Sequence, residues 1–192
     1  MEINMKKLAI VYYSGYGHTK VLAEEVKRGI DSIANVESTL FDTQSLKDSV
    51  DVLDDYDAII LGSPTYMGSV AAGLKEFMEK SSRKWYEQKW KNKIAAGFTN
   101  SHSLSGDKLN SLMQLVVFAA QHGMIWVGQA EHNQSPEGFA GKEDVVNRIG
   151  SYLGVMAQSE NDTPDVTPPS GDKLTAYKFG QRIAEITKAF SF

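Results

Sequence analysis

A short polar loop near the start of the chain carries residue types that commonly bind phosphate. The loop reads Ser14-Gly15-Tyr16-Gly17-His18-Thr19 and lies between an apolar run and a segment whose apolar residues have helical spacing. Its backbone N–H groups can turn toward an anion, and the following helix adds the positive end of its dipole. The hydroxyls of Ser14 and Thr19 can donate further hydrogen bonds. The alternative is a plain strand-to-helix turn with Thr19 as the N-cap.

The sequence of this loop indicates which class of phosphate-containing ligand it can bind. It is not Gly-x-Gly-x-x-Gly, and we expect no acidic residue at the ribose-binding end of the second strand, so a dinucleotide is disfavoured. The Gly-Lys-Ser/Thr of a nucleoside-triphosphate loop is also missing. A phosphomonoester such as that of FMN fits better.

Two further polar loops follow predicted strands. The first, residues 62–69, contains Pro64, Thr65, Tyr66, Met67 and Gly68, which can lie against a flat ring and offer it backbone hydrogen bonds. The second, residues 99–106, contains Thr99, Asn100, Ser101, His102, Ser103 and Ser105. Each loop alone could be an ordinary turn. Their convergence at one sheet edge predicts a site for a flat heterocycle with polar edges.

The elements that must position these loops alternate between strands and helices. The pattern predicts strands at 8–13, 36–41, 58–61, 94–98 and 124–127, and helices at 19–33, 71–80, 107–121 and 173–190. Such alternation indicates an α/β fold, a flavodoxin-like five-stranded parallel sheet of order 2-1-3-4-5 with helices on both faces. We expect a single domain over residues 1–192. The polar stretches 128–141 and 159–172 are long connections, either functional or disordered.

Composition excludes several classes of function. The net charge is −4 and the pI about 5.6, with no basic stripe for nucleic acid or an anionic membrane. The chain has no cysteine, and its four histidines are scattered without ligand spacing, so no metal site is expected. The apolar run after residues 1–7 is too short for a signal peptide or an integral membrane span. We expect a cytoplasmic protein.

Three segments resemble the WrbA-type NAD(P)H:quinone oxidoreductases, a family of flavodoxin-like flavoproteins. They are Tyr12-Tyr13-Ser14-Gly15-Tyr16-Gly17-His18, residues 56–65 and His122-Gly123-Met124. The resemblance covers residues 7 to about 130 and, loosely, the C-terminal helix. It implies non-covalent FMN, a homodimer or homotetramer, and two-electron transfer from NAD(P)H to a quinone or a related small-molecule acceptor.

The resemblance also assigns roles to single residues. The loop 14–19 would hold the FMN phosphate, residues 65–67 would touch the isoalloxazine ring, and residues 100–105 would line its other side. The resemblance places Tyr16, Trp85 and His122 at the nicotinamide or substrate site, Trp85 across a subunit boundary. The family often has His-His-Gly-Met where this chain has Gln121-His122-Gly123-Met124, so contact with the flavin would fall to Gln121 or be lost. The loop with Asn100, His102 and Leu104 also departs from the family's small residues.

Three functions stay open from the sequence. In the leading hypothesis NAD(P)H delivers a hydride to the flavin, leaves, and a quinone takes the same place; no side chain need act as acid or base. The second hypothesis is a flavodoxin-type electron carrier reduced by a separate reductase. Such carriers usually have a net charge more negative than the −4 of this chain. The third is an interaction protein that keeps the fold without flavin.

Overall fold

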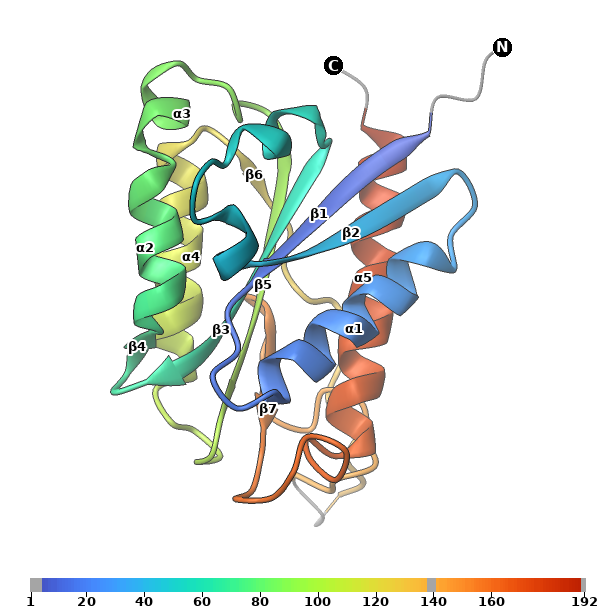
Figure 1. The fold of residues 1–192 in the computed structure, drawn as a ribbon. Coiled ribbons are helices and arrows are strands. Elements are labelled where there is room, and N and C mark those ends of the chain that lie inside the picture. Colours follow the sequence, from blue (N-terminus) through green and yellow to red (C-terminus); the bar gives the residue numbers. More distant parts are fainter. Residues whose placement is uncertain (1–4, 138–140, 191–192) are drawn as a thin grey trace.

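A computed structural model describes residues 5–137 and 141–190 of the chain (Figure 1). Its central sheet contains the five predicted parallel strands: β1 (Lys6–Tyr12), β2 (Val36–Asp42), β3 (Ala58–Tyr66), β5 (Ile94–Ser101) and β6 (Ile125–Trp126). They lie in the order β2-β1-β3-β5-β6, which along the chain is the predicted order 2-1-3-4-5. The predicted fold class is therefore confirmed.

Two short strands were not predicted. β4 (Ser69–Val70) pairs antiparallel with the end of β3, and β7 (Val155–Gln158) pairs parallel with the second half of β5. β6 pairs only with the start of β5, at Ile94 and Ala95. The two strands β6 and β7 thus share one edge of the sheet, and β5 has a partner as far as Ser101.

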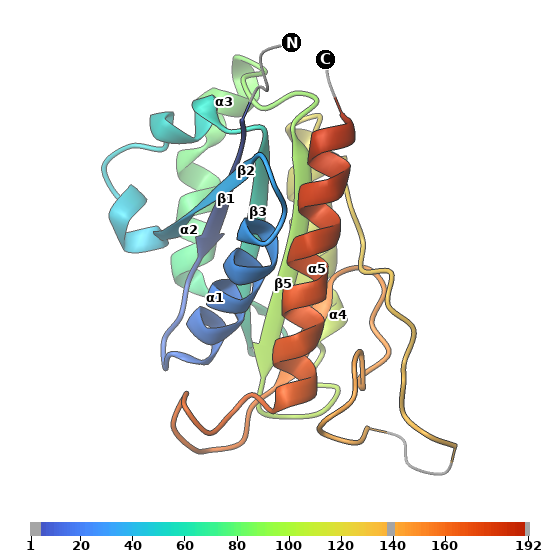
Figure 2. The same cartoon turned by 90° about the vertical axis from the view of Figure 1, so that its right-hand side faces the viewer.

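Helices cover both faces of the sheet (Figures 1 and 2). On one face lie α1 (His18–Asp31) and α5 (Ser170–Ala189), which pack closely against each other. A Cβ on Gly29 would come within 1.9 Å of the Tyr177 carbonyl oxygen, so only glycine allows this approach. On the other face lie α2 (Ala72–Lys80), the short α3 (Ser82–Tyr86) and α4 (Lys108–Gln121).

The core has one apolar cluster on each side of the sheet, because successive strand residues point to opposite faces. Leu8 and Ile10 of β1 lie in the cluster beneath α1 and α5, whereas Ala9 and Val11 lie in the other. This explains the unbroken apolar run that predicted β1. In the described part of the chain, no helix is both long and apolar enough to cross a bilayer.

The connection after β2 differs from expectation. β2 ends at Asp42, so an acidic residue does end this strand; its carboxylate accepts a hydrogen bond from the Gln44 N–H and caps a 3-10 turn at Thr43–Leu46. A second 3-10 turn follows at Asp51–Asp55. Residues 159–169 form an ordered loop before α5. Of the polar stretch 128–141, residues 138–140 lie outside the described part, as do residues 1–4 of the N-terminal segment.

Candidate functional site

A cleft of about 820 Å³ opens where β1, β3 and β5 end. Three predicted loops meet there, and eleven of the predicted site residues line the cleft: Ser14, Tyr16, His18, Thr19, Pro64, Thr65, Tyr66, Met67, Asn100, Ser101 and His102. Its size lies within the range of small-molecule sites in proteins. The remaining wall is a run of six residues from the loop between β7 and α5, Ser159, Glu160, Asn161, Asp162, Thr163 and Pro164.

The first loop presents a set of free backbone donors. The Ser14 hydroxyl oxygen accepts hydrogen bonds from the N–H groups of Gly17, at 3.1 Å, and Lys20, at 3.2 Å. Within the part of the chain that the structure describes, four other N–H groups have no acceptor, those of Gly15, Tyr16, His18 and Thr19. They lie at the N-terminus of α1, whose first turn holds no acidic residue. This arrangement fits a phosphate group.

An aromatic pair stands beside this loop. Tyr66, at the end of β3, lies so close to Gly15 that a Cβ there would be 2.7 Å from the phenol oxygen. Tyr16 meets the Tyr66 ring edge to face, with centroids 6.4 Å apart, and is itself 77% exposed. Burial, with Tyr13 and Tyr16 nearby, raises the pKa of Tyr66 above its ordinary value. Its phenol therefore keeps its proton at neutral pH.

Buried hydroxyls tie the second loop to the third. The Thr65 hydroxyl lies 2.8 Å from that of Thr99 and donates to the Ser111 hydroxyl at 2.7 Å. All three residues are buried, so these hydroxyls satisfy one another's hydrogen-bonding needs within the protein. Thr99, predicted to touch the cofactor, instead lies beneath the cleft and supports Thr65.

Lys108, the first residue of α4, fixes the shape of the third loop. Its ammonium donates to the Ser101 hydroxyl at 3.1 Å and to the carbonyls of Ser103 and Leu104 at 2.7 and 2.8 Å. The side chain is fully buried, and this burial lowers the pKa of Lys108 to about 8. Ser103 therefore serves through its carbonyl as a loop anchor rather than as part of the cleft wall.

Two more predicted contacts lie outside the cleft wall. Gly68 forms the tight turn between β3 and β4 with a positive φ of 75°. Ser105 faces a neighbouring hollow on the other side of the third loop. Both residues shape the loops that carry the site but do not themselves line the cleft.

The loop 159–164 is the part of the site that sequence reasoning missed. It is fastened to the first loop, since His18 Nε2 donates to the Asp162 carbonyl at 2.9 Å and Pro164 packs on Gly17. It is also held to the third loop, because the Ser159 hydroxyl donates a hydrogen bond of 3.0 Å to Asn100 Oδ1. Figure 1 shows this segment beneath the start of α1. The available signal was the polar, proline-rich composition of the longer stretch 159–172.

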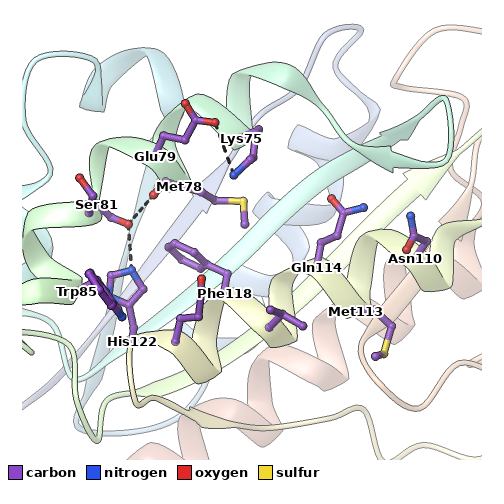
Figure 3. Close-up of a pocket in the computed structure, with 13 residues that line it drawn as sticks. Lys75, Met78, Glu79, Ser81, Trp85, Asn110, Met113, Gln114, Phe118 and His122 are labelled. Atoms are coloured by element: carbon purple, nitrogen blue, oxygen red, sulfur yellow. Dashed lines mark hydrogen bonds and ion pairs between the residues drawn. The ribbon is translucent and has the colours of Figure 1, made fainter.

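Three predicted residues lie in a different place within the protomer. Trp85, Gln121 and His122 line a second cavity of about 640 Å³ between α2, α3 and α4 (Figure 3). α4 starts at the cleft and has 14 residues, so its last residue is about 20 Å away. Gln121, predicted to contact the flavin, therefore does not reach the cleft of its own chain, and neither does His122, predicted at the nicotinamide or substrate site.

His122 is held as a neutral ring in this second cavity. The Ser81 hydroxyl donates to the Met78 carbonyl at 2.7 Å, so it accepts from His122 Nε2 at 3.0 Å. His122 stacks on Trp90 with centroids 4.6 Å apart and is 2% exposed. Burial lowers the pKa of His122 from 6.5 to about 4. Its role in the described structure is to pack the end of α4.

We expect this histidine to make the protein less stable in mild acid. Between pH 6.5 and about 4 the unfolded chain binds a proton at His122 that the folded chain does not, so stability falls as the pH falls. The contribution is about 1.4 kcal/mol per pH unit. Urea unfolding at several pH values should show this extra slope in wild type and in His102→Asn, but not in His122→Phe. Equal slopes in wild type and His122→Phe would contradict the assignment.

The chain is similar to known proteins over nearly its whole length. The family model for NADPH-dependent FMN reductases matches residues 32–135. Flavodoxin FldP of Pseudomonas aeruginosa is 39% identical, covering 95% of this chain and 97% of that protein. Quinone-oxidoreductase QR2 of Triphysaria versicolor is 33% identical, covering 95% of each chain.

A solved structure agrees with these relatives. The flavodoxin WrbA-like protein from Agrobacterium tumefaciens is 36% identical with a TM-score of 0.73, covering 97% of this chain and 99% of that one. Fold, cleft and relatives together show that the chain belongs to the NADPH-dependent FMN reductase family, and within it to the flavodoxin-like proteins of WrbA type.

Proposed function

We propose that the chain is an FMN-dependent oxidoreductase that transfers two electrons from NAD(P)H to quinones or similar small acceptors. The observation that carries this proposal is the cleft, where four unpaired N–H groups at the N-terminus of α1 lie beside two polar loops and an exposed aromatic pair. Relatives that are named quinone dehydrogenases or oxidoreductases support it. The proposed unit is one domain spanning residues 1–192.

The residues of the cleft fit FMN. The phosphate would take the free N–H groups of Gly15, Tyr16, His18 and Thr19, close to the cleft that Thr19 also lines. The ring system would lie between residues 64–67 and residues 100–102, whose backbone groups can bond its polar edge. Gly15 and Gly17 allow Tyr66 and Pro164 to pack closely on the phosphate loop, because side chains at the two glycines would meet them. When bound, FMN supplies the two-electron redox chemistry.

The chain's own residues bind and orient the ligands. Tyr66 remains a neutral phenol at the rim, and no side chain of the cleft has to give or take a proton. Tyr16 and Met67, both strongly exposed, offer a surface on which a nicotinamide and then a quinone can stack in turn. The buried hydroxyls of Thr65 and Thr99 bond to each other beneath the cleft.

We further propose that the protein works as a homodimer or homotetramer in the cytoplasm, where NAD(P)H is available. Leu109, Met113 and Val117 form an exposed apolar stripe along α4, and Trp85 is 49% exposed beside it. Such a stripe supports packing against a second copy. In that assembly Trp85 would reach the cleft of the neighbouring protomer. Sedimentation equilibrium on wild type and Val117→Glu tests the association.

The proposed activity is tested by turnover. FMN-loaded protein should oxidise NADH or NADPH in the presence of benzoquinone, with one nucleotide consumed per quinone reduced. The same protein freed of FMN is the control and should be inactive. Turnover that appears only after a separate flavin reductase is added would overturn the proposal.

The second candidate is an electron carrier of the flavodoxin type, because FldP is a flavodoxin by name and is 39% identical. A carrier steers onto basic partners through its own acidic surface, and a net charge of −4 gives little steering. The observation that separates the two functions is whether a nicotinamide nucleotide alone reduces the bound flavin.

A further inference from the structure

The rim of the cleft carries negative charge without a cation to offset it. Among the seventeen residues that line the cleft there are two carboxylates, Glu160 and Asp162, and neither a lysine nor an arginine. Both acidic side chains belong to exposed residues of the loop 159–164. A substrate that enters the cleft therefore meets this loop as one of its walls.

The position of the loop is set by several contacts. The Glu160 N–H donates to the Thr167 hydroxyl at 3.2 Å, and the Glu160 carboxylate accepts from Gln158 Nε2 at 3.3 Å. Gln158 is in turn held by Arg148 at 3.1 Å. Asp162 is fixed through its carbonyl by His18, and its carboxylate accepts from the Thr163 N–H at 2.7 Å. The two charges therefore keep their place at the rim.

Three cations on neighbouring elements have other partners. Arg148 forms a two-pronged ion pair with Asp172, at 2.8 and 3.0 Å, and both side chains are buried. The Lys108 side chain is buried, and its ammonium donates hydrogen bonds to the carbonyls of Ser103 and Leu104. Lys20 lies near Glu24, at 3.8 Å. None of these three cations lines the cleft, so the lysine, arginine and carboxylate charges among its lining residues are the two negative ones of Glu160 and Asp162.

We propose that Glu160 and Asp162 make the cleft select its substrates by charge, favouring NADH over NADPH and uncharged over anionic acceptors. This rests on the proposed function. NADPH carries a phosphate that NADH lacks, so the rim repels it more strongly and slows its approach. The family is described as NADPH-dependent, so the preference would be a property of this chain's own rim. Because the carboxylates are exposed, salt screens the effect.

The test compares two variants with the same change in charge. Glu160→Gln/Asp162→Asn removes both rim charges. The control, Glu37→Gln/Asp55→Asn, removes two exposed charges at the amino ends of the strands, on the opposite edge of the sheet. For each protein, stopped-flow gives the second-order rate constants for flavin reduction by NADH and by NADPH. The measurements are made at about 0.01 M and about 0.5 M salt, where screening is weak and strong.

The expected result is a preference for NADH of about tenfold at low salt that shrinks at high salt. The rim variant should lose most of this preference and its salt dependence, whereas the control variant should keep both. The proposal would be overturned if the preference for NADH were the same at both salt concentrations and were unchanged in the rim variant. An equal response of the two variants would also overturn it.

A second arm keeps the inference testable if neither nucleotide reduces the flavin. The FMN-loaded protein is reduced by light with EDTA as the electron donor, and its reoxidation is followed with benzoquinone, which is uncharged, and with ferricyanide, which is anionic. Removing the rim charges should speed reoxidation of the flavin by ferricyanide several-fold and leave the rate of reoxidation by benzoquinone unchanged. Unchanged rates with both acceptors would refute charge selection, whatever the electron donor proves to be.

Discussion

Gly17→Ala is expected to weaken FMN binding by at least about 30-fold, which is about 2 kcal/mol. Gly17 precedes α1 with a φ of 92°, in the left-handed region, where an alanine costs about 1–2 kcal/mol. A Cβ there would also stand 2.5 Å from Pro164 Cγ. Either the phosphate loop or the loop 159–164 must therefore move, and the free N–H groups lose their common direction. Titration with FMN, followed by quenching of its fluorescence, measures the loss.

Gly150→Ala is the matched control for this variant. Gly150 has a similar φ of 74°, but its Cβ would have only the Asn133 side chain nearby, at 3.9 Å. Both variants should lose a similar part of their unfolding free energy through backbone strain. Only Gly17→Ala should lose affinity for FMN. If the two bind FMN equally well, the phosphate does not lie at the N-terminus of α1.

Arg148→Met is expected to lower the free energy of unfolding by about 3–5 kcal/mol. The guanidinium and the Asp172 carboxylate are 3% and 2% exposed and pair at 2.8 Å. Burial already raises the pKa of Asp172. Without Arg148 that carboxylate stays buried without its cation, and Gln158 loses a contact that holds the cleft wall. Urea denaturation of wild type and variant gives the difference.

Lys178→Met serves as the control for this ion pair. Lys178 pairs with Glu131 at 3.4 Å, and both side chains are about one-third exposed, so the loss should be within about 1 kcal/mol. Arg148→Met/Asp172→Leu should recover most of the lost stability, because no unpaired charge remains. Equal losses in Arg148→Met and Lys178→Met would show that the buried pair contributes no more than a surface one.

The sequence predicted those parts of the molecule whose signals are local. The apolar run of β1 and the small polar loops behind β1, β3 and β5 follow from residue type and spacing alone. The parallel order then brings those loops to one edge. This is why eleven of the predicted site residues line the cleft.

The missed parts depend on contacts that are distant in the chain. β7 has only four residues, and its pairing with β5 crosses more than fifty positions. The loop 159–164 reaches the cleft through His18 and Asn100, which no local pattern reveals. Gln121 was misplaced because a motif match fixes its position along α4 but not which end of the helix faces the cleft.

The central claim is that this chain takes electrons from a nicotinamide nucleotide without help from another protein. The most direct measurement mixes FMN-loaded protein with NADH or NADPH in an anaerobic stopped-flow instrument and follows the visible absorption of the flavin. The expected result is complete bleaching by one equivalent of nucleotide and full return of the absorption with one equivalent of benzoquinone. Absorption that persists with both nucleotides until a separate reductase is added would contradict the claim.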